Sequence, residues 1–533
     1  MNDFLYGVRK LWAAPTFALT VIVTLALGIG ATTAIFSVVD SVLLKPFVFQ
    51  NADRLMRIRF TQQGHGDAGT PMDLVDYGTQ VPQFEGVSVI DGFTANLVTP
   101  NGDPDRALGV QVGANFFGLL RTKPLYGRFF TQGEDQEGAP DVVVLGEGLW
   151  RRDFGGDPRV VNQTIRLNGK PVTVVGISRM GEQYPLQAEV WVPRKFVAIE
   201  KDDQSRGARW LGWMARVKDD ANVDQAAVQV THVSEAMEKR FPNIYNERRA
   251  NIVTLQAYSF SDVRKPLFVM LAATALVLLI ACANVANLML VRGTSREGEL
   301  AIRTALGAGR GRLVRQLIAE SLVLTVLGAA GGIALAKTGM STLLGMAPPI
   351  VLQVAGQSLD NGALLLSGAV AMLTAFVFGT LPAAQIKRTE LSHALRAGGR
   401  GARSVHTANR VRRLIIAAEV ALAVTLLAGA GVLLRSFQRL VNVDPGFKSA
   451  QLLTMKLQLP QQGYDTPAKQ LAFAEQLRAS LAAIPGAQSV ALADNLPLDG
   501  GGEDYSFEIQ GAPPADPKNP PDAAVRRVTP GFF

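Results

Sequence analysis

The sequence has very little cysteine and histidine. Cys282 is the single cysteine among 533 residues, so the chain can form no internal disulfide, and any domain outside the cytoplasm must be held by packing. The four histidines are scattered without metal-ligand spacing, which gives no basis for a metal site. Paired catalytic carboxylates and a nucleophile elbow are also missing from the sequence. We therefore expect no catalytic residues in this chain.

Charged residues are scarce too, and long apolar runs take their place. Charged residues make up 18% of the chain and apolar residues 48%, between a soluble enzyme and a fully embedded transporter. A helix needs about 20 apolar residues to cross a bilayer. Five stretches qualify: 16–39, 266–290, 316–337, 363–385 and 413–434. The first follows Arg9 and Lys10, as a signal peptide would, but its long run lacks a cleavage site and favours an uncleaved anchor.

The connectors between these spans predict the orientation. Those after the second span and over 391–412 are rich in arginine, whereas the loop 338–361 has none. Short basic loops remain in the cytoplasm. The sequence therefore predicts a multi-pass membrane protein with residues 1–15 in the cytoplasm and 40–265 and 435–533 outside. The arginines of these connectors account for the net charge of +8, and no nucleic-acid partner is expected.

Residues 40–265 alternate short β-branched runs with turn signals, which indicates an α+β extracytoplasmic domain. The runs 163–167 and 172–177 flank Asn168-Gly169, the strongest short-range signal for a β-hairpin. Periodic apolar residues predict an amphipathic helix over 221–241. The charged run 151–153 is interpreted as solvated surface rather than as a site.

The end of the chain resembles part of this domain. Residues 107–117 resemble 523–533, and each stretch follows a span and a short strand-like run, 53–58 and 451–455 respectively. A second copy of the module therefore begins near residue 413, with 435–533 as the start of a second, incomplete extracytoplasmic domain. We expect the chain to be truncated, because half a sheet would leave an open edge. A naturally shorter second module is the alternative.

The basic connector after the second span carries the most specific motif. Residues 296–310 read Arg-Glu-Gly-Glu-Leu-Ala-Ile-Arg-Thr-Ala-Leu-Gly-Ala-Gly-Arg, with charged and apolar residues at helical spacing and Gly307 as a stop. Two interpretations fit a short amphipathic helix here. It is either a basic helix held at the membrane surface by anionic lipid, or a coupling helix that docks into a cytoplasmic motor.

This pattern, followed by Gln316, Glu320 and Ser321, resembles the signature of MacB/FtsX-type ABC transporter permeases. The order of one span, an external domain and three further spans also resembles MacB, and the restart near 413 resembles the duplicated orphan permeases of acidobacteria. The resemblance implies a MacB-type periplasmic core domain over 40–265 and an FtsX-like permease domain over 266–390. The same resemblance implies that the multi-pass chain lies in the bacterial inner (plasma) membrane. It also implies a helix that contacts an ATPase through Glu299, Arg303, Leu306, Gly307 and Arg310.

The sequence departs from MacB in one respect that bears on function. MacB carries an ATPase domain before its first span, whereas residues 1–15 precede the first span here, and the phosphate-binding motif Gly-x-x-x-x-Gly-Lys-Ser/Thr is missing. We therefore expect a permease subunit, not an enzyme, without a cofactor of its own, and with ATP hydrolysed by a separate ABC ATPase.

Such a subunit would couple ATP hydrolysis to extracytoplasmic movement that exports or extrudes antibiotics, peptides or lipoproteins. Further expected partners are membrane lipid and a periplasmic adaptor or a second permease copy. The alternatives are a motor-less sensor or scaffold and a regulator of a cell-wall hydrolase.

Glycines and polar residues stand out within the spans. Small residues let helices approach closely, so the glycines predict helix packing within one chain or, as the alternative, across a dimer. These glycines are Gly28 and Gly30 in the first span and Gly328 and Gly332 in the third. Asn284 and Asn287 share one face of the second span and should face protein. Glu419 is expected to pair with an arginine at the membrane interface, with proton or substrate handling as the alternative.

Overall fold

The computed structural model divides into two compact units. The membrane unit comprises Met1–Lys45 and Phe260–Leu452, and the external unit comprises Pro46–Ser259 and Leu453–Phe533. The structure describes residues 14–44, 47–62, 65–98, 104–295, 310–345, 362–376, 403–448, 451–459, 463–496, 503–511 and 521–533.

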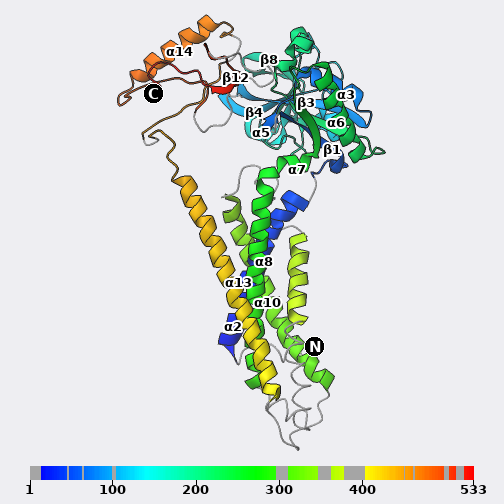
Figure 1. The fold of residues 1–533 in the computed structure, drawn as a ribbon, viewed down its shortest axis with the longest axis vertical. Coiled ribbons are helices and arrows are strands. Elements are labelled where there is room, and N and C mark those ends of the chain that lie inside the picture. The colour runs from blue at the N-terminus through cyan, green and yellow to red at the C-terminus, as the bar shows by residue number, and fades with distance from the viewer. Residues whose placement is uncertain are drawn as a thin grey trace, which may run out of the picture. The chain divides into compact units, whose positions relative to one another are not determined.

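The membrane unit is built from long apolar helices (Figure 1). Its elements are α2 (Pro15–Val39) with the π-helical turn η1 (Asp40–Leu44), α8 (Ser261–Ser295), α10 (Arg310–Gly345), the shorter helix Gly362–Phe376 and α13 (Arg403–Val441). The four long helices are sufficiently long and apolar to cross a membrane. The predicted span 363–385 is described only as far as Phe376. A shared core between α2, α8 and α10 includes Leu25, Val285 and Leu324.

The external unit contains a mixed sheet in the order β11-β1-β10-β3-β4-β9-β6-β8-β5. Within this order β4 and β9, and likewise β6 and β8, are parallel, and the other pairs are antiparallel. The strands are β1 (Leu55–Gln62), β2 (His65–Asp67), β3 (Phe84–Val98), β4 (Pro104–Val112), β5 (Tyr126–Gly127), β6 (Val142–Gly146), β7 (Thr164–Leu167), β8 (Lys170–Ser178), β9 (Val190–Pro193), β10 (Gly212–Val217) and β11 (Arg248–Thr254).

Two helices, α3 (Pro71–Gln80) and α6 (Val223–Arg240), pack against β1, β10 and β3 through one apolar core. In α3, Thr70 and Asp73 form a reciprocal capping box, and in α6 the apolar residues at helical spacing are buried. The shorter helices are η2 (Ala52–Arg54), α4 (Phe116–Leu120), α5 (Glu147–Asp153), η3 (Pro158–Val160), η4 (Ala198–Lys201), η5 (Asp203–Gly207) and α7 (Leu255–Ser259).

Six strands of the sheet form a closed ring. The pairings run β3–β4, β4–β9, β9–β6, β6–β8, β8–β7 and back from β7 to β3. The predicted hairpin supplies the last step, because Asn168 and Gly169 have φ angles of 50° and 81° and turn β7 into β8. Asn168 also closes the ring: its Oδ1 accepts from the backbone N of Asn96 at 2.8 Å, and its Nδ2 donates to the Thr94 carbonyl oxygen at 3.2 Å.

The region predicted to begin a second module, 435–533, contains α14 (Pro467–Ala482), β12 (Glu503–Ser506) and β13 (Asp522–Val525). One detail repeats the first module: α3 and α14 both begin with Thr-Pro, and the Thr70 and Thr466 hydroxyls each accept from the backbone N–H three residues later. The run 451–455, expected to be strand-like, forms no strand. Its counterpart β1 is held between β10 and β11, and the described part of the second module offers it no such neighbours.

The predicted fold class, a multi-span helical membrane protein with an α+β extracytoplasmic domain, is confirmed by these elements. The boundaries of the external domain differ slightly from 40 and 265. Helical backbone continues through Leu44, because the sequence offers no helix breaker before Pro46, and α8 already begins at Ser261. The five added N-terminal residues of α8 include Asp262, whose negative charge is favourable near a helix N-terminus.

Candidate functional site

The candidate site is the group of helices that flanks the segment 296–309. α8 ends at Ser295 directly before this segment, and α10 begins at Arg310 directly after it. The predicted ATPase-contacting residues Glu299, Arg303, Leu306 and Gly307 lie outside the described residues. Arg310 is the first residue of α10, and its side chain is likewise outside them. The described part of the site therefore consists of the helices on which this segment would act.

Glycines bring α2 and α10 into close contact. A Cβ atom added to Gly30 would lie 2.8 Å from the carbonyl oxygen of Gly332, and one added to Gly332 would lie 3.0 Å from the Gly30 nitrogen. At Gly328 an added Cβ would lie 2.7 Å from the Cβ of Leu25. These distances leave no room for a side chain, so the backbones meet directly. The predicted glycines thus lie in a contact between helices of one chain.

Hydroxyl groups complete the packing of α2 against its other neighbours. A Cβ atom at Gly28 would lie 3.1 Å from the Cβ of Ala281 in α8. One turn further, the Thr32 Oγ1 lies 3.2 Å from the Thr274 carbonyl oxygen of α8, and Thr33 Oγ1 lies 2.7 Å from Ser367 Oγ in the helix Gly362–Phe376. These contacts of Thr32 and Thr33 could not be predicted from the sequence. The sequence shows only the pair of threonines that follows the glycines of the first span.

The polar residues predicted within the spans have different environments. Asn284 is exposed on this chain, so the expectation that it faces protein together with Asn287 is wrong for Asn284. Each residue turns the side chain by about 100° around a helix, so Asn284 points away from the core that Val285 and Met289 share. Asn287 is half-buried, and its Oδ1 has no hydrogen-bond partner among the described residues. Glu419 is half-buried in α13 and forms no ion pair with Arg413; the Arg412 side chain lies outside the described residues.

The helices α2 and α8 lead into two neighbouring strands of the external unit. The chain passes from α2 through η1 and η2 into β1, and from β11 through α7 into α8. β1 and β11 are antiparallel, with a register that runs from Met56 opposite Thr254 to Gln62 opposite Arg248. The first residue of β1 and the last residue of β11, from which the chain continues into α2 and α8, therefore lie at the same end of this strand pair.

Buried charges hold the other end of β11. Asp73 of α3 and Arg248 of β11 are almost completely buried. The Nη1 and Nη2 atoms of Arg248 donate to the Asp73 carboxylate at 3.1 and 3.0 Å. The Tyr245 hydroxyl donates to the same carboxylate at 2.9 Å. Burial and the adjacent Asp73 charge raise the pKa of Tyr245 to about 12, so the hydroxyl stays protonated. A second buried pair, Arg206 with Asp76, joins this cluster through Tyr245.

The charged run 151–153, interpreted from the sequence as solvated surface, is an ion-pair cluster. Arg152 binds Asp105, Asp153 and Glu189 at 2.8, 3.0 and 2.7 Å, and Arg151 binds Glu147 at 2.7 Å. The hydrogen bond from Arg152 is the largest cause that lowers the pKa of Asp105. Because Arg152 joins α5 to residues of β4 and of the segment before β9, the cluster braces the ring of strands.

Comparison with known proteins assigns the external domain and the helices that follow it to two known domain families. The MacB-like periplasmic core domain matches residues 18–233, and the FtsX-like permease C-terminal domain matches residues 271–391. The macrolide export ATP-binding/permease protein MacB of Salmonella paratyphi A is 27% identical over 354 residues, which cover 60% of this chain and 50% of that protein. The pyoverdine export ATP-binding/permease protein PvdT of Pseudomonas savastanoi is 24% identical over 321 residues, covering 58% and 46%.

The chain thus spans about half the length of these relatives. Among solved structures, the periplasmic region of MacB from Actinobacillus actinomycetemcomitans is 16% identical and covers 41% of this chain and 93% of its own, with a TM-score of 0.30. The two domain matches follow each other along the chain in the order of the external unit and the helices that come after it. The chain is a MacB/FtsX-type permease of the ABC transporter class.

Proposed function

We propose that this chain converts ATP hydrolysis by a separate ATPase into movement of its extracytoplasmic domain, and that the movement drives export. Permeases of this family work with ATPase partners, and the relatives above carry the words ATP-binding and permease together in their names. The distribution of arginine supports a cytoplasmic N-terminus and a cytoplasmic connector over 296–310. Antibiotics, peptides and lipoproteins are the proposed classes of cargo.

The observation that carries this proposal is the connectivity around 296–309. A force on this segment acts at once on the last residue of α8 and the first residue of α10. Both helices pack closely on α2, α10 with its backbone at Gly332 and α8 with side chains such as that of Ala281, so the three helices would move together. Because α2 and α8 continue into the adjacent strands β1 and β11, the movement would reach the external domain through the backbone itself.

The test uses the full-length protein purified gently with its ATPase from the native host, followed by an assay of ATP turnover. We expect charge reversal by Arg303→Glu, and separately by Glu299→Arg, to abolish permease-stimulated turnover while membrane insertion persists. Arg400→Glu is the matched control, since Arg400 is an equally basic residue of the second predicted cytoplasmic connector.

Stimulated turnover that is unchanged by Arg303→Glu would refute the role of this segment. Recovery of the permease without any ATPase, under conditions that retain the complex in a related transporter, would instead support a motor-less sensor or a regulator of an extracytoplasmic hydrolase.

A further inference from the structure

The closed ring of strands in the external unit has one filled end, and its other end holds a cavity that Gln458 and Leu459, from outside the ring, also line. Its interior holds an apolar core to which all six strands contribute. At the other end lies a cavity of about 370 Å³. Each strand of the ring provides at least one lining residue: Phe93 in β3, Gln111 in β4, Val192 in β9, Val142 in β6, Val172 in β8 and Leu167 in β7. The mouth of a small closed sheet is a common location for a ligand.

The inward face of β4 shows how the cavity arises. Residues two apart on a strand share a face, and Ala107, Gly109 and Gln111 follow one another in this way. Ala107 belongs to the core. At Gly109 an added Cβ would lie 2.4 Å from the Phe93 ring, so the absence of a side chain lets this ring lie against β4. Gln111 then places an amide where the core ends, and this amide forms no hydrogen bond with the described residues.

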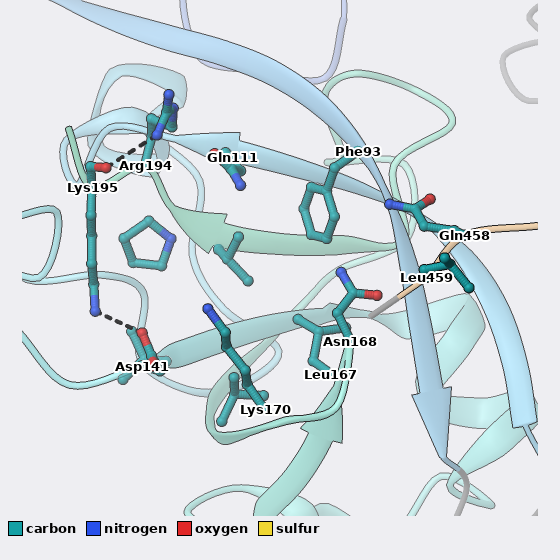
Figure 2. Close-up of a pocket in the computed structure, with 14 residues that line it drawn as sticks. Phe93, Gln111, Asp141, Leu167, Asn168, Lys170, Arg194, Lys195, Gln458 and Leu459 are labelled. Carbon is teal, nitrogen blue, oxygen red and sulfur yellow. Dashed lines mark hydrogen bonds and ion pairs between the residues drawn. The ribbon is translucent and has the colours of Figure 1, made fainter. Parts of the chain in front are cut away.

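The charged residues at the cavity are mainly cationic. Lys170, Arg194 and Lys195 line it together with a single carboxylate, Asp141. Lys195 binds Asp141 at 2.7 Å, and Arg194 binds Glu200 at 2.7 Å outside the cavity. Figure 2 shows Gln111, Phe93 and Lys170 extending toward the middle of the space. An amide, an ammonium group and an aromatic ring therefore converge above an apolar floor.

We propose that this cavity is a binding site for a small carboxylate that carries an apolar group. The carboxylate would accept hydrogen bonds from Lys170 and Gln111, and the apolar group would pack against Phe93, Val192 and Leu167. The cavity volume is near the lower end of the range for ligand sites, about 300–1,000 Å³, which restricts the ligand to a compact molecule. This site is independent of the proposed transport cycle, because a permease that couples to an ATPase does not need it.

The experiment measures binding to the full chain in lipid nanodiscs by calorimetry, with empty nanodiscs as the blank. The probe is 3-phenylpropionate, and its neutral analogue 3-phenylpropanamide has the same shape without the charge. We expect saturable binding of the acid and binding weaker by about tenfold or more for the amide, the difference that one charge-assisted hydrogen bond makes. Equal affinity for both, or no saturable binding of the acid, would overturn the proposal.

Variants locate the binding site. Lys170→Met keeps the aliphatic stem and removes the charge, and Gln111→Leu removes the amide at nearly constant size. Each is expected to weaken binding of the acid by about tenfold or more. The controls Lys123→Met and Gln132→Leu change the same residue types at exposed positions away from the cavity and should leave binding unchanged. Unchanged affinity in both cavity variants would refute the site.

Two sources offer this ligand chemistry, a free organic acid and the carboxyl end of a peptide. N-acetylphenylalanine, which adds the amide of a peptide end to the same acid, separates them. Tighter binding than 3-phenylpropionate would assign the site to a peptide terminus, and weaker binding would assign it to a free acid.

Discussion

The buried pair between Asp73 and Arg248 gives the sharpest stability prediction. The two side chains are 0% and 1% exposed, and their closest nitrogen and oxygen atoms lie 3.0 Å apart. At this distance and an effective dielectric constant of about 20, their attraction amounts to about 5–6 kcal/mol. The substitution Asp73→Asn preserves the shape of the side chain but leaves the Arg248 charge buried without its counterion. We expect the free energy of unfolding to fall by about 3–5 kcal/mol, the usual cost of breaking a buried pair.

Tryptophan fluorescence of the full chain is a suitable assay, because four of the five tryptophans, Trp150, Trp191, Trp210 and Trp213, belong to the external unit. For a domain of this size the expected decrease in melting temperature is about 6–20 °C. Asp220→Asn, at an exposed position, is the control and should have little effect.

The double variant Asp73→Asn with Arg248→Met tests the cause. Removing both charges leaves no unpaired ion in the core, so at least half of the lost stability should return. A double variant no more stable than Asp73→Asn alone would show that the lost hydrogen bonds, and not the unpaired charge, account for the loss. A small decrease for Asp73→Asn, similar to that of the control, would refute the reasoning altogether.

Two further predictions follow from the geometry. Gly30→Leu should destabilise the membrane unit by about 1–3 kcal/mol, because the leucine side chain would meet the Gly332 backbone. Gly431→Leu is the control and should have little effect, since nothing lies within 4 Å of an added Cβ there. The measurement is the fraction of protein that elutes as a single species after heating. The pKa of Glu147 lies below its usual value because the Met180 N–H and Arg151 bind its carboxylate. Its stabilisation is therefore present above the unfolded pKa and is lost as pH falls through the folded pKa. Glu147→Gln should melt lower than the parent at neutral pH and equally in strong acid, and a constant difference between the two conditions would contradict this.

The features that the sequence predicted well depend on neighbours in the chain. Spans follow from length and apolar character, the hairpin from the residues Asn168-Gly169, and α6 from apolar spacing over 221–241. Each of these signals lies within about 25 residues, where periodicity and turn chemistry act. The family resemblance carried by 296–310 was confirmed by both domain matches.

The features that escaped prediction depend on distant pairings. The ring closes where β7 pairs with β3, and there Asn168 binds the backbone of Asn96 and Thr94, more than 70 residues away. Arg206 and Arg248 are charged side chains, for which exposure is the ordinary expectation, and their burial depends on Asp76 and Asp73 of helix α3. The cavity could not be predicted for the same reason, since its lining comes from six strands and from loops and a distant segment that no local pattern brings together.

The register between β1 and β11 limits the movements that the membrane helices can make. Both chain ends that lead into the membrane unit are at the Met56–Thr254 end of the ladder. Pulling these ends apart would break the hydrogen bonds between β1 and β11 one after another, starting at this end. Each bond contributes only about 0.5–1.5 kcal/mol to the stability of the fold. A shift of both helices together would load none of them. The domain can therefore follow α2 and α8 when they tilt or slide as a pair, and it would begin to unravel at Met56 if they separated.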